Sequence, residues 1–154
     1  MVCVPVAMVN GEVVAFKKYL TELEAVSAYL KLEAIRLEER LRVKIDMDPL
    51  SLGTQIPPML LQTLVENGVK HGVARMALGG EIRVVSEMRN GALKIRVQNS
   101  GQLSESSGST RMGLDNIRQR LQLLYGDAAS LVLRNLDADF VIAEVSIPLA
   151  KIPA

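Results

Sequence analysis

The chain has 154 residues, with 18 Lys and Arg against 17 Asp and Glu, so its net charge is near +1. That length favours one domain with a buried core, and the balanced charge argues against a nucleic-acid partner. The single cysteine, Cys3, excludes an internal disulfide and fits a reducing, cytoplasmic compartment. No apolar run reaches the roughly 20 residues that cross a bilayer, so we expect this stretch not to be membrane-inserted.

Residues 1–17 are apolar but lack the basic leader and the cleavage site of a signal peptide. Asn10-Gly11 suits a hairpin turn between two apolar runs. The segment could equally be a leader or the remnant of an interdomain connector. Residues 18–150 are predicted to form one domain, because no repeat or linker interrupts them.

The first predicted helix covers residues 22–40. Thr21 and Glu24 match a capping box, and apolar residues then recur at steps of three and four, which is typical of one helical stripe. Alternating apolar residues at positions 43, 45 and 47 predict a half-buried strand that Pro49 stops. Pro57-Pro58 predicts the start of a second helix, since proline is tolerated at a first helical position.

The second half of the chain predicts four strands and one more helix. The runs "EIRVVSE" and "ALKIRVQN" flank Asn90-Gly91 and predict a β-hairpin. Residues 102–111 are rich in Ser and Gly, which indicates a loop, and a third helix over 113–125 is ended by Gly126. Strands over "SLVLRN" and "FVIAEVSIP" follow. This order favours an α/β fold: a two-layer α+β sandwich whose mixed sheet of about five strands has three helices on one face.

The second helix carries polar side chains on the side that its leucines avoid. Five of them fall within about a third of the helix circumference: Thr63, Glu66, Asn67, Lys70 and His71. The solvated face of an ordinary amphipathic helix has the same pattern. The sequence that follows favours a functional role, because a strand ending in Asn99-Ser100-Gly101, a Ser/Gly loop and a helix with Gly113 come in order.

Three stretches carry a resemblance to a known family: "TELEAVSAYLKLEAIRLEERL", "IPPMLLQTLVENGVKHG" and "MGLDNIRQRLQLLYG". In this order they resemble the nucleotide-binding blocks of the GHKL superfamily, and within it the catalytic domain of autolysis-regulator (LytS/YehU-type) sensor histidine kinases. The resemblance covers residues 18 to 149, and residues 56–72 are its most specific part. It implies the Bergerat-type ATP-binding fold, with ATP and Mg²⁺ as cofactors.

The resemblance implies roles for the polar face of the second helix, with Glu66 and Asn67 as the catalytic pair. Asn67 lies at the position of the asparagine that ligates Mg²⁺, an ion that takes few protein ligands and completes its shell with water and phosphate. Glu66 would accept a hydrogen bond from a metal-bound water, with a plain surface carboxylate as the alternative. Lys70 would reach toward the phosphates. His71 would line the adenine and ribose end and would not be a phosphoacceptor.

Asn99 lies where the family has an Asp that accepts a hydrogen bond from the adenine amino group. An amide oxygen accepts the same bond without charge assistance, so we expect a loss on the order of 1 kcal/mol, partly offset by cheaper burial. The alternative is a strand-end Asn that favours the turn into Ser100-Gly101. Gly101 would let the backbone pass close to the base. Leu103 replaces the family's second glycine and residues 137–140 replace its Gly-Thr pair, so the sequence predicts weak nucleotide affinity.

Residues 102–111 resemble the family's ATP lid, which is too poor in apolar residues to order itself and would close only over nucleotide. Gly108 and Gly113 lie at the phosphate-facing glycines. The amides of Gly113 and Leu114, which open the predicted third helix, would bind phosphate through unpaired N–H groups and the helix dipole. Arg118, a turn further on, is a candidate phosphate contact, with a solvated side chain as the alternative.

The resemblance implies a histidine protein kinase domain that transfers the γ-phosphoryl group of Mg·ATP to a histidine on a separate dimerisation domain, of the same or a sister kinase, and from there to a response regulator. Thr63 stands where hydrolytic relatives have a carboxylate, so ATP hydrolysis should be slow. This stretch would be the cytoplasmic domain of an inner-membrane sensor, inactive alone because it lacks the acceptor helix. Two alternatives stay open: a degenerate nucleotide-binding or protein-interaction module, and an anti-sigma serine kinase.

Overall fold

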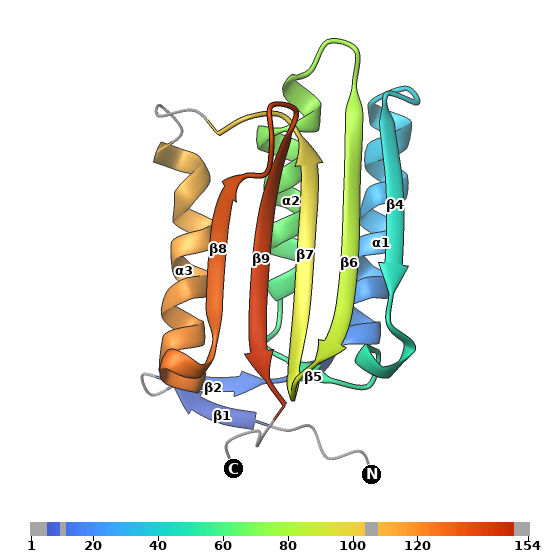
Figure 1. Cartoon of the computed structure of the whole chain (residues 1–154). Helices are drawn as coiled ribbons and strands as arrows, with labels where there is room; N and C mark the ends of the chain where they lie inside the picture. The colour runs from blue at the N-terminus through green and yellow to red at the C-terminus, as the bar shows by residue number, and fades with distance from the viewer. Residues whose placement is uncertain (1–5, 10–11, 104–107, 150–154) are drawn as a thin grey trace.

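A five-stranded mixed sheet forms one layer of the molecule and three helices form the other (Figure 1). The computed structural model describes residues 6–9, 12–103 and 108–149. The strand order is β4-β6-β7-β9-β8; β4 runs parallel to β6, and the other neighbouring pairs are antiparallel. Their bounds are Leu41–Met47 for β4, Gly80–Arg89 for β6, Ala92–Ser100 for β7, Ser130–Asn135 for β8 and Phe140–Pro148 for β9. The predicted α+β sandwich is confirmed.

The helices α1 (Tyr19–Arg36), α2 (Leu60–His71) and α3 (Gly108–Tyr125) cover a single face of this sheet. The core lies between the two layers. It takes the predicted stripe of α1, the apolar side of α2 and alternate strand residues, among them Leu23, Val26, Leu30, Leu61, Leu64, Ile82, Ile95 and Val145. Each strand places every second side chain toward the helices, which is why the sequence alternates along β6 and β7.

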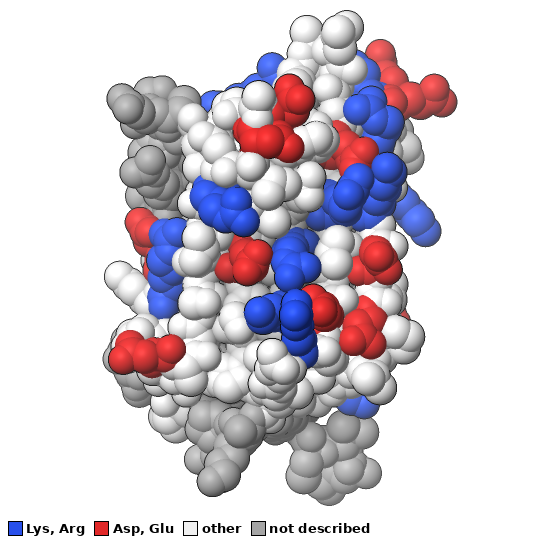
Figure 2. All heavy atoms as spheres, viewed as in Figure 1, with Lys and Arg blue, Asp and Glu red and all other residues white. Residues whose placement is uncertain are grey.

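The face of the sheet that the helices leave uncovered is charged, with both signs intermixed (Figure 2). Glu81 forms ion pairs with Lys44 at 3.6 Å and with Arg83 at 2.8 Å. Arg96 lies between Glu87 at 3.5 Å and Glu144 at 3.3 Å. The Glu81–Arg83 pair lies within β6, whereas the other three pairs link neighbouring strands across the surface, as opposite charges on facing strands commonly do.

The N-terminal segment forms a hairpin at the lower end of the molecule in Figure 1. Strands β1 (Val6–Val9) and β2 (Glu12–Ala15) pair antiparallel, with Val6 opposite Ala15. The predicted hairpin is confirmed for these strands, and its predicted turn at Asn10-Gly11 lies outside the described residues. The prediction that residues 1–17 are a leader or the remnant of an interdomain connector stays a prediction. The chain then enters the domain through β3 (Lys17–Lys18), which pairs with β5 (Gln55–Ile56).

Helix α1 begins three residues before its predicted start, and the capping box is wrong. The N-cap is Lys18, without a side-chain cap, and Thr21 lies inside the helix. The first N–H groups are satisfied instead by a distant loop, since Tyr19 N donates to Thr54 O at 2.8 Å and Leu20 N to Leu52 O at 3.0 Å. The helix also ends earlier than predicted, because Glu38 and Glu39 adopt positive φ where the chain turns into β4.

The other two helices also start elsewhere than predicted. Pro57-Pro58 precede α2, whose N-cap is Met59 in the left-handed region with φ 68°. Helix α3 begins at Gly108, not at Gly113, so the described part of the predicted loop ends at Leu103 and residues 104–107 lie outside the description. Short 3₁₀ turns span Pro49–Ser51, Val73–Arg75 and Gly126–Ala128.

Candidate functional site

Part of the predicted site lies at one end of the molecule, where α2 finishes beside the carboxyl end of β7 (Figure 1). Asn99 is the penultimate residue of β7 and is 8% exposed. Its side chain points toward α2, because odd-numbered residues of β7 face the helical layer. The strand and the helix thus bring Asn99 next to the last turns of α2, as the sequence order of the motifs predicts.

Glycines make this close approach possible. A Cβ at Gly68 would lie 3.2 Å from Asn99 Oδ1, and one at Gly72 would overlap Asn99 Nδ2. Gly101 follows β7 with φ +131°, a conformation that side chains rarely adopt, and a Cβ there would lie 3.7 Å from the same nitrogen. Gly68 and Gly72 were missed as site residues, although two glycines four residues apart mark one bare strip along a helix.

Asn99 is held by its own strand end. Its Nδ2 donates to the carbonyl of Ser100 at 3.0 Å, and the Ser100 hydroxyl accepts from the backbone N–H of Glu81 at 2.8 Å. With the nitrogen engaged, Oδ1 is the atom of this side chain that can accept a further hydrogen bond. A site built on Asn99 therefore presents an acceptor.

The polar face of α2 is partly enclosed by its neighbours. Lys70 is exposed, whereas the other four side chains are half-buried: Thr63, Glu66, Asn67 and His71. Glu66 accepts a hydrogen bond from Gln62 at 3.0 Å. On the side of α3, a Cβ at Gly113 would lie 3.4 Å from the Thr63 methyl carbon. The face is thus flanked by protein, unlike the fully solvated face of an isolated amphipathic helix.

Two titratable groups at this face are shifted. Burial, and after it the nearby cations Arg75 and Lys70, lower the pKa of His71, so its imidazole is neutral at pH 7. Its Nδ1 lies 3.4 Å from Arg75 Nη2. On α1, burial and then the carboxylates of Glu33 and Glu66 raise the pKa of Tyr29 to about 12. The end of α2 therefore combines a neutral imidazole with a flexible ammonium group.

The start of α3 differs from the geometry that the sequence predicted. Gly113 is the sixth residue of α3 and Leu114 is 1% exposed in the core, so neither lies among the first four residues whose N–H groups lack helical partners. Those groups belong to the turn that begins at Gly108. The prediction that Gly113 and Leu114 open the helix is therefore wrong, because the helix extends one turn further back.

Arg118 is not brought to the polar face of α2. Its Nε donates to the carbonyl of Leu131 on β8 at 3.2 Å, and its Nη1 pairs with Asp115 at 2.9 Å. Positions 113 and 118 point about 140° apart on a helix, so the arginine lies on the far side from the Gly113–Thr63 contact. Its predicted phosphate contact has no support in this geometry.

The turn between β8 and β9 occupies the place of the missing Gly-Thr pair. Asp137 Oδ1 accepts from the backbone N–H groups of Asp139 and Phe140, which fixes the turn. The turn then anchors the segment that follows β7, through three bonds: Gly101 N to Asp139 O at 2.9 Å, Gln102 Nε2 to Asp137 O at 2.8 Å, and Leu103 N to Asn135 Oδ1 at 2.9 Å. Two backbone donors beside the candidate site are therefore used within the chain.

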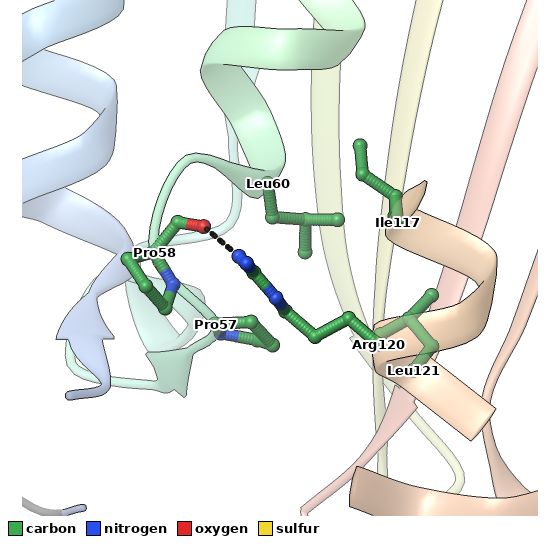
Figure 3. A pocket seen from close by; sticks show the side chains of 6 residues that line it. All are labelled: Pro57, Pro58, Leu60, Ile117, Arg120 and Leu121. Atoms are coloured by element: carbon green, nitrogen blue, oxygen red, sulfur yellow. Dashed lines mark hydrogen bonds between the residues drawn. The ribbon is translucent and has the colours of Figure 1, made fainter. Parts of the chain in front are cut away.

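The opposite end of α2 is fixed by α3 at a small pocket (Figure 3). Arg120 reaches across from α3, and its Nη1 donates to the carbonyl of Pro58 at 3.3 Å. Pro57, Leu60, Ile117 and Leu121 complete the lining. None of the predicted site residues lines this pocket, which serves to seat the start of α2 against α3.

No protein-family profile matches the chain. Among curated proteins it is similar to the sensor protein LytS of Staphylococcus saprophyticus, with 32% identity over 74% of the chain and 22% of the relative. The sensor histidine kinase/phosphatase LytS of Staphylococcus aureus is 34% identical over 71% of the chain and 21% of its own length.

Among solved structures, the nucleotide-free catalytic domain of histidine kinase ThkA superposes with a TM-score of 0.64 at 16% identity, covering 88% of the chain and 96% of that domain. ThkA in complex with the response regulator TrrA gives a TM-score of 0.63, with 90% of the chain and 43% of that structure covered. Sequence and fold thus agree on one family. The chain is a GHKL catalytic domain of the LytS type.

The GHKL domain spans about a fifth of the LytS proteins that it matches. Within the described residues, none of its helices is both long enough and apolar enough to cross a bilayer. Nor do the described residues gather three or more His, Cys, Asp and Glu side chains in one place. A metal ion held here by the polar face of α2 would rely on few protein ligands, which is the habit of Mg²⁺.

Proposed function

We propose that this GHKL domain binds Mg·ATP and transfers its γ-phosphoryl group to a histidine on a separate dimerisation domain. The observation that carries the proposal is the buried Asn99, set against the glycine strip of α2 beside the half-buried polar face of that helix. A base acceptor on β7 then lies beside the end of the helix that carries the polar groups for phosphate and metal.

At the base end, Asn99 Oδ1 accepts from an exocyclic amino group, and Gly101 leaves the backbone bare for a flat ring to approach. His71, whose Nδ1 lies 3.4 Å from Arg75 Nη2, places a neutral imidazole beside the base and sugar. A neutral amide at position 99 makes a weaker bond than a carboxylate, so we expect modest affinity.

At the phosphate end, Asn67 would supply a carbonyl oxygen to Mg²⁺, and Glu66 would accept a hydrogen bond from a metal-bound water. Held there, the ion would supply positive charge to neutralise the charge on the phosphate oxygens during transfer. Lys70, exposed one turn beyond Glu66, brings a flexible positive charge to the same oxygens. Gly108, where α3 begins, is the remaining glycine proposed for this end.

In the proposed reaction, an imidazole nitrogen of the acceptor histidine bonds to the γ-phosphorus, the bond from that phosphorus to the β,γ-bridging oxygen breaks, and ADP leaves. Thr63 holds the position from which a carboxylate would activate water, and a hydroxyl is a poor base at neutral pH. Transfer is thereby favoured over hydrolysis. The phosphoryl group then passes to a response regulator, and the domain belongs to the cytoplasmic part of a membrane sensor.

One observation favours a second candidate, a degenerate module that binds nucleotide weakly or not at all. The β8–β9 turn engages the backbone N–H groups of Gly101 and Leu103, which are then not available to a ligand. Such a module would act through contacts with other proteins. The sequence supports this candidate through its departures from the family pattern: Asn99, Leu103 and the absent Gly-Thr pair.

Isothermal titration with Mg²⁺ and a nonhydrolysable ATP analogue distinguishes the two. We expect saturable heat that Asn67→Ala reduces about tenfold or more, as removing a metal-site partner does. Asn116→Ala, at an exposed position of α3, is the matched control and should titrate like the parent chain. No heat up to millimolar analogue would reject the kinase proposal, whereas phosphohistidine formed on a cognate acceptor helix would reject the degenerate module.

A further inference from the structure

Helix α1 has a second apolar side that the domain does not use. Leu23, Val26 and Leu30 point into the core. On the outward side, Leu20 is 40% exposed and Ile35 is 75% exposed. These two side chains lie near opposite ends of α1, about 22 Å apart along its axis, so within one copy they do not form a single patch.

The outward side borders a groove between α1 and β4. The two elements lie at the same edge of the molecule (Figure 1), and the groove is lined by both: Leu20, Leu23, Glu24, Ser27, Ala28, Lys31 and Met47. Strand β4 is the last of the sheet on this side, so the groove is not capped by another strand of the described sheet. Its floor is apolar, through Leu23 and Met47, and its rim carries one acid and one base.

The order of residues on this side is self-complementary. Consider a two-fold axis that crosses α1 between Ser27 and Ala28 and runs perpendicular to the helix. It places Leu20 opposite the partner's Ile35, and Glu24 opposite the partner's Lys31. The small residues at the centre permit the close approach of two helices, about 8–10 Å between axes. Every contact of such a pair occurs twice, as in an isologous interface.

The charges support this arrangement over a generic apolar contact. Glu24 and Lys31 are seven residues apart, roughly 10 Å along the helix, so they are too distant to pair with each other. Both are exposed, and within the described part of the chain neither forms an ion pair. In the antiparallel pair each of these charges meets its opposite from the second copy.

We propose that α1 is the interface of a homodimer, in which two copies of this chain pack their α1 helices antiparallel across the axis between Ser27 and Ala28. Ile35 of each copy inserts beside Leu20 and Met47 at the end of the other's groove. The contact area of one helix and one groove is at the small end of specific interfaces, so the dimer is weak, with dissociation in about the micromolar to high-micromolar range. The nucleotide site lies on α2 and is not part of this surface.

Sedimentation velocity of the full 154-residue chain, from about 1 µM to 1 mM, tests the proposal. The weight-average sedimentation coefficient should rise from monomer to dimer over this range. Ile35→Glu should keep the chain monomeric throughout, because it places a charge in the groove. Leu123→Glu is the matched control, since Leu123 is 54% exposed on α3 and lies outside the surface.

The charge pair supplies the decisive variants. Glu24→Lys should raise the dissociation constant about tenfold, because two attractive pairs become repulsive, and Lys31→Glu should do the same. The double variant Glu24→Lys, Lys31→Glu exchanges the partners and should restore the parent value. Glu24, Lys31, Ile35 and Leu123 are all exposed, so the circular dichroism spectrum of each variant should match that of the parent chain. A parent chain that stays monomeric to about 1 mM, or a double variant as weak as the single ones, overturns the antiparallel dimer and leaves the groove to a different protein.

Discussion

Gly72→Ala is the sharpest test of how the site is built. A Cβ at this position would overlap Asn99 Nδ2 and lie 2.6 Å from Gly68 O and 2.8 Å from Ser100 O. Two of these three neighbours are backbone atoms, one in α2 and one in β7, so no side-chain rotation relieves the clash. The helix end must move away from the strand, and Asn99 must leave its hydrogen bond to Ser100.

The magnitude follows from the packing. Forcing an extra carbon into a tight site typically lowers the free energy of unfolding by about 1–3 kcal/mol. Alanine also lowers the conformational entropy of the unfolded chain, which offsets about 0.5 kcal/mol of that loss. The net expectation is a loss of about 2 kcal/mol in the free energy of unfolding. With a urea dependence of about 2 kcal/mol per molar, the unfolding midpoint falls by about 1 M.

Gly53→Ala is the matched control, because a Cβ at Gly53 meets nothing within 4 Å and its φ is not positive. It should leave the urea midpoint within about 0.3 M of the parent, or raise it slightly. If Gly72→Ala unfolds at the same urea concentration as Gly53→Ala, the close packing of α2 on Asn99 is incorrect, and the acceptor geometry inferred from it fails too.

Three further outcomes follow from the site. Asn99→Asp should tighten binding of the ATP analogue about fivefold, since a charge-assisted bond adds on the order of 1 kcal/mol; unchanged calorimetric affinity would mean that position 99 does not contact the base. Arg118→Gln should leave that affinity unchanged and lower the free energy of unfolding by about 1 kcal/mol, because it removes the hydrogen bond from Arg118 Nε to Leu131 O. Because the pKa of His71 is lowered in the fold, the unfolded chain binds more protons near pH 6; the urea midpoint should therefore fall as pH drops below about 6.5, and His71→Gln should lessen that fall.

The sheet was predictable from sequence because its signals are local. Alternation set the faces of β6 and β7, and the turn between them has positive φ at both Asn90 and Gly91, the residues that best tolerate it. The last two strands have the predicted bounds, since the polar Asp137 turn interrupts two apolar runs. In each case the position of the strand or turn is determined by residues that are close together in the sequence.

The site was predictable only in part. Periodicity assigns Asn99 to the helical face of β7, and the structure packs it against Gly68 and Gly72 at the end of α2. The start of α3 decides which of its backbone N–H groups lack a helical partner. It therefore also decides how Gly113 and Arg118 lie relative to those groups. A Ser/Gly-rich segment gives no periodic signal, so the sequence could not set that boundary.

The starts of α1 and α2 differ from the predicted ones for a shared reason, because each is held by groups from the segment that carries the other. Tyr19 N at the start of α1 donates to Thr54 O, next to β5, and β3 pairs with β5 immediately upstream of α2. Glu22 of α1, 3% exposed, lies at the start of α2: burial raises the pKa of this carboxyl, while the N–H groups of Met59 and Leu60 oppose that rise. Each helix is therefore started by groups from the other segment. The pairing of β3 with β5 and the burial of Glu22 thus fix the start of α2, and Asn67 lies about two helical turns from that start.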